Sequence, residues 1–329
     1  MKNGFWDKIR KPAFVLAPMA DVTDASFRRL IASRGKPDVF WTEFVSADGL
    51  ALAPEEGKKK LMLDLMYTEA ERPIVAQFFT SNPENMRKAS RLAKELGFDG
   101  VDINMGCPDK TVERQGAGAS LIKNPEIARE LIKSAKEGAQ DLPVSVKTRI
   151  GYNKVELETW LNELLKEDPA LITIHARTRK EMSKVPARWE FVKRAVEIRN
   201  ERGSKTLIFG NGDVMNISEA KKRVAETSCD GVMLGRAIFG NPWLFNEGYI
   251  PNLKEKLETL IENIYLFEEI LMKAQYGAKS FAIMKKHFKA YITGFDGAGE
   301  LRQLLMESKT PTEAIYLIKN FIASSAECC

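Results

Sequence analysis

The feature that most constrains this fold is a repeated unit, in which a short apolar or β-branched run is followed by a longer stretch with helical spacing. Eight such runs occur, and their starts lie 24 to 43 residues apart. That is the scale of a strand–helix unit of about 30 residues or more. Strands that are apolar throughout are typical of a parallel sheet covered on both faces. The runs span residues 14–19, 39–44, 74–79, 100–105, 143–149, 170–177, 206–212 and 230–236.

Eight such units can build either a (β/α)8 barrel or a doubly wound open sheet. An open sheet concentrates its site near one switch point, whereas a barrel gathers polar groups at the C-terminal ends of its strands. Polar residues lie at or just after the ends of nearly all the runs, and this favours the TIM barrel. These residues are Asp21, Glu43, Gln77, Asn104, Lys147, His175, Asn211 and Arg236.

The strand pattern stops near residue 246, and four segments with helical spacing follow. About 80 residues of helix are enough for a small bundle. We therefore predict two domains, a catalytic barrel over residues 1–246 and an all-helical domain over residues 247–329. The predicted helices of the second domain span residues 253–273, 278–292, 301–307 and 312–323.

Composition excludes several classes of protein. The first residues contain no apolar signal-peptide core, and no run approaches the roughly 18 apolar residues of a membrane span. Four cysteines without a C-x-x-C pair, and only two histidines, argue against a metal site or a disulfide framework. We expect a cytoplasmic protein, monomeric and without membrane or metal. The formal net charge of +5 permits a polyanionic partner without requiring one.

A phosphate site is predicted at the ends of the last two runs. No G-x-G-x-x-G or G-x-x-x-x-G-K-[ST] motif is present, so a dinucleotide bound on a Rossmann unit is disfavoured. Segment 210–213 (GNGD) and the pair Gly235-Arg236 would expose backbone amides and a guanidinium where barrels commonly hold phosphate. The alternative is that these glycines only terminate strands.

Lys147, His175, Arg177 and Cys107 are the other candidate site residues. Lys147 lies in an apolar strand, where a cation is costly unless it is paired or used at a cofactor. An ion pair with Glu43 or Asp102 is the alternative. His175 and Arg177 point to one face at a strand end, although His175 also suits a packed core. Cys107 follows the fourth run, where a thiol can donate a proton or can simply be a small buried side chain.

Taken together, the motifs resemble those of the tRNA-dihydrouridine synthase family over about residues 14–308. Any one string would be weak support, but seven or more in family order are specific. The strings are LAPM (16–19), DVTDASFR (21–28), AQF (76–78), DINMGCP (102–108), GAGASL (116–121), VKTRIG (146–151), IHARTR (174–179), GNGDV (210–214), GRAIFGNPWLF (235–245) and, in the helical tail, MKKHFKAYITGFDGAGELR (284–302).

The resemblance implies FMN-mediated reduction of the C5=C6 bond of uridines in tRNA, with NADPH or NADH as a transient reductant. Cys107 would be the general acid, and Asn104 would lie beside the target base. Arg177, at the same mouth, would also bind the substrate, and Lys285, Lys286 and His287 would contact RNA. The residues implied in FMN binding are Ala17, Pro18, Met19, Gln77, Lys147, His175, Asn211, Gly212, Asp213, Gly235 and Arg236.

Departures from the usual family pattern, such as Ala176 where glycine is common, put the subclass in doubt but not the activity. Three other hypotheses remain open from the residues. The chain could be an FMN barrel that reduces a free pyrimidine or another conjugated small molecule. It could bind tRNA without turnover, or bind a phosphorylated metabolite without flavin. The basic stretch 279–289 contains no acid, which favours an RNA partner, although such a helix can also be a solvated face.

Overall fold

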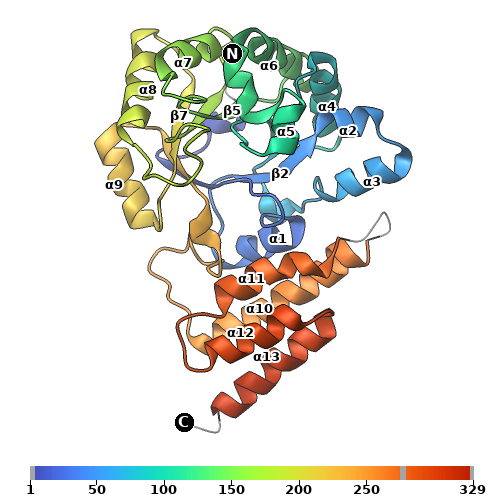
Figure 1. Ribbon diagram of the computed structural model, residues 1–329. Coiled ribbons are helices and arrows are strands. Elements are labelled where there is room, and N and C mark those ends of the chain that lie inside the picture. Colours follow the sequence, from blue (N-terminus) through green and yellow to red (C-terminus); the bar gives the residue numbers. More distant parts are fainter. Residues whose placement is uncertain (1–3, 275–278, 327–329) are drawn as a thin grey trace.

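The computed structural model describes residues 4–274 and 279–326, in which helices surround a curled parallel sheet (Figure 1). The sheet has eight strands in the order β1-β8-β7-β6-β5-β4-β3-β2. The chain therefore winds once around a (β/α)8 barrel, which confirms the predicted fold class. The strands are β1 (Ala13–Leu16), β2 (Phe40–Ser46), β3 (Ile74–Phe79), β4 (Gly100–Met105), β5 (Val144–Arg149), β6 (Leu171–His175), β7 (Leu207–Asn211) and β8 (Gly231–Leu234).

The barrel closes between β1 and β2 through a side chain instead of a strand ladder. The carboxylate of Asp38, just before β2, accepts a hydrogen bond from the Phe14 amide at 2.6 Å. The Asp38 amide in turn donates to the Phe14 carbonyl at 3.0 Å. These two bonds satisfy backbone groups that a closed ladder would otherwise pair.

Within the described residues, nine helices lie on the barrel between its strands, as Figure 1 shows for those labelled. The strands are buried on both faces because these helices cover the outside while strand side chains fill the inside. They are α1 (Ala25–Arg34), α2 (Ala47–Leu52), α3 (Glu55–Leu63), α4 (Pro83–Glu95), α5 (Lys110–Arg114), α6 (Pro125–Ala139), α7 (Leu157–Leu165), α8 (Glu190–Glu201) and α9 (Ile217–Thr227).

The N-terminal end of the barrel is plugged by aromatic side chains. Trp6, which precedes β1, is fully buried. Its ring lies 5.6 Å from Phe209 edge-on and 6.0 Å from Trp41. Because the axis of the barrel is filled at this end, a ligand that reaches the barrel interior is expected to enter from the C-terminal ends of the strands.

The helical tail packs as a separate cluster beside α1, with α10 to α13 at the lower side of Figure 1. Its buried core includes Leu260, Phe267, Phe288 and Leu305. No helix in the described part of the chain is both long and apolar enough to cross a membrane. The tail helices are α10 (Leu253–Phe267), α11 (Lys285–Tyr291), α12 (Ala298–Glu307) and α13 (Pro311–Ala326).

The first two tail helices are shorter than predicted. α10 gives way to a π turn over Glu268–Met272. The next predicted helix begins at Ala278, outside the described residues, and its described part is a 3-10 turn, Phe281–Met284, followed by α11. The Ser280 hydroxyl accepts the Ala282 amide at 3.3 Å, which starts this turn.

Candidate active site

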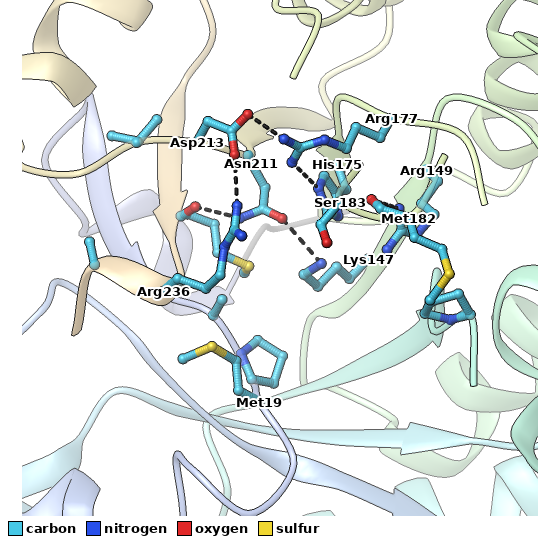
Figure 2. Close-up of a pocket in the computed structure, with 18 of the residues that line it drawn as sticks. Met19, Lys147, Arg149, His175, Arg177, Met182, Ser183, Asn211, Asp213 and Arg236 are labelled. Atoms are coloured by element: carbon cyan, nitrogen blue, oxygen red, sulfur yellow. Dashed lines mark hydrogen bonds and ion pairs between the residues drawn. The ribbon is translucent and has the colours of Figure 1, made fainter. Parts of the chain in front are cut away.

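A pocket of about 290 Å³ opens at the C-terminal ends of the strands (Figure 2). It brings together eleven of the residues that the sequence singled out, which lie near or just after the C-terminal ends of β1, β5, β6, β7 and β8. These are Ala17, Pro18, Met19, Lys147, His175, Arg177, Asn211, Gly212, Asp213, Gly235 and Arg236. Met182, Ser183, Met215 and Pro108 also line it.

The loop after β7 has a backbone that requires glycine. Gly212 has φ +126°, and a Cβ there would lie 2.8 Å from the Ala187 side chain. Gly210 has no room for a side chain either, because Trp189 would lie 2.2 Å from its Cβ. The Trp189 indole donates a hydrogen bond to the Gly212 carbonyl at 2.9 Å and so fixes the position of the loop. The backbone can therefore approach a ligand closely at this point.

Asp213 holds two arginines at the edge of the pocket. Its carboxylate accepts hydrogen bonds from Arg177, from Arg236 at 2.8 Å and from the Ala187 amide at 2.8 Å. Partial burial favours the neutral acid, but the hydrogen bond from Arg177 and the charges of both arginines outweigh it and lower the pKa of Asp213. An ionised carboxylate has no donor for a phosphate. The Asp213 side chain therefore orients the two arginines, and the contact of this residue with FMN stays a prediction.

His175 is neutral and has a defined tautomer. Burial, reinforced by the charges of Arg149 and Lys147, lowers the pKa of His175 well below its usual range. Its Nε2 lies 3.2 Å from the Arg177 guanidinium, which can only donate. Nε2 must therefore accept, and the proton of the neutral ring is on Nδ1.

Lys147 is a half-buried cation with one weak hydrogen bond. Its Nζ donates to Asn211 Oδ1 at 3.4 Å, as Figure 2 shows. Burial lowers the pKa of Lys147 to about 8, and the charge of Arg149 acts in the same direction. Lys147 does not form the alternative ion pair with Glu43 or Asp102. The Glu43 carboxylate pairs with Lys279, and the Asp102 carboxylate accepts hydrogen bonds from the neutral side chains of Gln77 and Ser145.

The charges of the pocket suit a bound anion. Four cationic side chains line it, Lys147, Arg149, Arg177 and Arg236, against one carboxylate, Asp213. The Arg236 side chain is 61% exposed and can reach a ligand without breaking a buried contact. A bound phosphate would balance this excess of positive charge. It could accept hydrogen bonds from the Arg236 guanidinium and from the backbone amides of the nearby glycines. The described residues contain no group of three or more His, Cys, Asp or Glu placed to bind a metal ion.

Behind the pocket wall, a buried chain of hydrogen bonds fixes the start of the loop after β4. Asn104 Oδ1 accepts the amides of Gly106 at 3.1 Å and Cys107 at 2.9 Å. Its amide nitrogen donates to Gln77 Oε1 at 3.1 Å, and Gln77 Nε2 donates to Asp102 at 2.6 Å. Because backbone amides can only donate, the direction of every bond in this chain is determined.

This chain gives Gln77 and Asn104 a structural role. Gln77 is fully buried and Asn104 nearly so, and neither lines the pocket. Both side chains position the backbone that carries Cys107. Direct contact of Gln77 with a cofactor and of Asn104 with a base stays a prediction. Asp102, which the sequence analysis considered only as an ion-pair partner, anchors the chain and also accepts the Ser145 hydroxyl.

Cys107 lies next to the pocket, whose wall includes its neighbour Pro108. Its side chain is half-buried and packs with Phe79 and Val112. Burial raises the pKa of the Cys107 thiol above its usual range, so the thiol keeps its proton at neutral pH. A protonated thiol can act as an acid but is a poor nucleophile.

Arg149 is a site residue that the sequence analysis missed. It lies two positions after Lys147 in β5, on the same face of the strand, and this spacing was the available signal. Its Nε donates to the Gly106 carbonyl at 2.7 Å, and its Nη1 donates to the carbonyls of Thr178 and Met182 at 3.2 Å each. Arg149 therefore joins the loops after β4 and β6 at the pocket.

The basic stretch of the tail is used differently from the prediction. His287 is fully buried against Phe27, with ring centroids 4.6 Å apart, and burial lowers its pKa to about 4. The prediction that His287 contacts RNA is wrong, because this face of α11 packs on α1. Lys279 is mostly buried in ion pairs with Glu43, at 2.8 Å, and Asp64. It is unavailable to RNA as well.

All three lysines of α11 remain near the surface, and Lys289 is exposed. Lys286 pairs with Asp21 at 3.1 Å, in the loop after β1, and its side chain is 46% exposed. Lys285 is half-buried. Their contact with substrate stays a prediction.

The fold and this site define a class of protein, a (β/α)8-barrel enzyme with an anion-binding pocket and a protonated thiol at the same mouth. The dihydrouridine synthase (Dus) family model matches residues 15–327. The chain belongs to this family.

Curated relatives agree with this assignment. A "probable tRNA-dihydrouridine synthase 2" of Bacillus subtilis (strain 168) is 42% identical over 98% of this chain and 97% of its own length. A "probable tRNA-dihydrouridine synthase" of Staphylococcus aureus (strain MRSA252) is 39% identical over 99% of this chain and 98% of its own length.

Among solved structures, a 2-naphthoyl-CoA reductase complex has a TM-score of 0.54 at 12% identity and covers 71% of this chain and 49% of its own. Histamine dehydrogenase from Rhizobium sp. 4-9 has a TM-score of 0.51 at 14% identity and covers 77% of this chain and 49% of its own. The chain thus spans about half the length of each. At these identities the likeness shows the barrel fold alone.

Proposed function

We propose that this protein reduces specific uridines of tRNA to dihydrouridine, with bound FMN and with NADPH or NADH as reductant. Membership of the dihydrouridine synthase family supports the reaction, and the names of the full-length relatives support tRNA as substrate. We further propose that it acts as a cytoplasmic monomer, that residues 1–246 form the catalytic domain and that residues 247–329 form an RNA-binding domain.

The observation that carries the cofactor assignment is the excess of positive charge at the ends of β5 to β8. Arg236 and the backbone of Gly212 and Gly235 would hold the phosphate of FMN, with Arg177 kept in place by Asp213. Ala17, Pro18 and Met19 offer an apolar wall for a planar ring. Lys147 would lie close to the ring and stabilise negative charge.

The reaction needs two hydrogens added across the C5=C6 bond of uracil. A bound flavin supplies a hydride to one carbon. The Cys107 thiol donates a proton to the other carbon, and the S–H bond breaks as the C–H bond forms. The raised pKa keeps the thiol protonated before this step, and Asn104 and Arg149 fix the backbone on either side of it. The uridine must leave its stack in the RNA to reach the thiol.

The test is NADPH consumption by the purified protein with unmodified tRNA, with free uridine or without acceptor. Absorbance would report bound flavin, and mass analysis of digested tRNA would detect a gain of two hydrogens on uridine. We expect this gain with tRNA alone. Reduction of free uridine without a tRNA product would support a small-molecule reductase, and a colourless protein would overturn the FMN assignment.

A further inference from the structure

Cations on the outer wall of the barrel are largely paired. On α8, Arg194 contacts Glu158 at 2.6 Å and Glu201 at 2.7 Å. On α9, Lys221 contacts Glu247 at 2.6 Å. A cation held by a carboxylate gains little from a second anion, because its charge is already compensated.

The mouth of the barrel differs from the wall. Six cations on the loops after β4, β5 and β6 are exposed and make no ion pair with the described residues. We call this set the mouth cations. They are Lys110, Arg114, Lys123, Lys154, Lys180 and Lys184.

These three loops carry the whole formal excess of positive charge. Segments 106–124, 150–156 and 177–189 together contain nine Lys/Arg and four Asp/Glu, an excess of five, equal to the net charge of the chain. Two of the four acids are neutralised within the loops, Glu113 by Arg179 and Glu181 by Arg188. The field at the mouth is therefore positive over a continuous area.

The three loops form one surface. The Arg179 amide donates to the Gly151 carbonyl and the Lys180 amide donates to the Tyr152 carbonyl, each at 2.9 Å. Two cations lie over the Tyr152 ring. The Lys123 amine, from the loop after β4, is 4.4 Å from the ring centroid, and the Arg179 guanidinium, from the loop after β6, is 5.4 Å from it. The helix that bears Lys110 and Arg114 begins three residues after Cys107. The surface thus borders the thiol directly.

We propose that the mouth cations form the main phosphate-contacting surface for tRNA, and that they hold the strand around the uridine presented to Cys107. This inference rests on the proposed function and refines it. Unpaired Lys and Arg side chains bind RNA phosphates at little cost and release counterions. Because Lys279 and His287 are buried, the tail cannot offer the dense basic stretch that its sequence suggests.

The test compares two double variants of the full-length protein that remove equal charge. Lys110→Ala with Arg114→Ala removes two mouth cations. Arg10→Ala with Lys205→Ala is the control, because both are exposed and unpaired among the described residues but precede β1 and β7, at the opposite end of the barrel. Affinity for unmodified tRNA would be measured from about 50 to 200 mM salt, together with dihydrouridine yield and flavin content.

For the mouth variant we expect weaker binding by about tenfold or more at low salt. The slope of log K against log salt should be shallower by about 1.4 to 1.8, from roughly 0.7 to 0.9 per lost phosphate contact. The control should keep the wild-type slope, and both should keep their flavin. An unchanged slope in the mouth variant, or an equal loss in the control, would overturn the inference while the wild type still makes dihydrouridine. A wild type that neither binds nor modifies tRNA would instead overturn the proposed function.

Discussion

The ion pair between Glu113 and Arg179 is expected to set the position of Cys107. The Arg179 Nε donates to one Glu113 oxygen at 2.7 Å, and its Nη2 contacts the other oxygen. Glu113 lies on α5 and Arg179 on the loop after β6, so the pair joins the segment after Cys107 to the loop two strands away. We predict that Arg179→Ala releases α5 and slows the step that uses the thiol.

The magnitude follows from how little else holds α5. This helix has five residues and buries only Val112. One more bond, from the Ser81 hydroxyl to the Gln115 carbonyl at 2.6 Å, secures its end. The Glu113 side chain is 10% exposed and would lose both of its charged hydrogen bonds. We expect Arg179→Ala to reduce the free energy that holds α5 in place by about 2–3 kcal/mol. This is less than for a fully buried ion pair, because Arg179 is partly solvated.

A loss of that size would reduce the population with α5 in place, relative to the released form, by roughly 30- to 140-fold. This ratio is the upper limit for the decrease in turnover. In single-turnover assays, flavin reduction by NADPH should keep its wild-type rate, because Arg179 does not line the pocket. Reoxidation by tRNA should slow, mainly in kcat. Exchanging the charges, with Glu113→Arg and Arg179→Glu together, should restore part of the rate lost in either single variant. Wild-type reoxidation in Arg179→Ala, or no recovery in the exchanged pair, would refute the positioning role.

Three further predictions concern single groups. Cys107→Ala should keep bound FMN and reduction by NADPH but lose most dihydrouridine, as mass analysis of digested tRNA would show; full yield would contradict the role of the thiol as acid. Burial raises the pKa of Asp102 from 3.8 to about 6, so the fold gains stability from this group as pH falls from about 6 to about 4. Relative to Asp102→Asn, wild type should therefore gain up to about 3 kcal/mol in urea unfolding at pH 4 compared with pH 7.5, and parallel pH profiles would refute this. Arg28 and Glu71 form an ion pair at 2.7 Å with no exposure of either side chain, and Arg28→Ala should lower the free energy of unfolding by about 3–5 kcal/mol, against less than 1 kcal/mol for the exposed Lys58→Ala.

The sequence predicted the barrel, and the grouping of Gly212, Gly235 and Arg236 at one pocket, because both depend on local patterns. Runs of apolar residues locate the strands, and a parallel barrel brings all their C-terminal ends to one mouth. Gly212, Gly235 and Arg236 follow strand ends directly, so their placement needed no knowledge of long-range contacts. Each was found at the pocket.

The sequence could not predict how deeply individual side chains are buried or which groups they hydrogen-bond. Alternation in a strand shows that Gln77 and Asn104 point inward, but not that Asp102 and the loop amides consume their polar groups. The same holds for α11, where helical spacing alone does not tell which face packs on the barrel. His287 is buried because Phe27, 260 residues earlier, lies against it.

The ionisable groups at the mouth of the barrel therefore fall into two sets, those that form ion pairs and those that do not. Arg177 and Asp213 neutralise each other and keep one geometry, which suits a cofactor that stays bound. Lys110 and Arg114 have no partner among the described residues, which suits a polyanion that must arrive and leave. Charge composition cannot separate these two groups, because the same residues contribute equally to it. The pairing does separate them, and it supports the proposal that FMN is held around Arg177 and Asp213 and tRNA around Lys110 and Arg114.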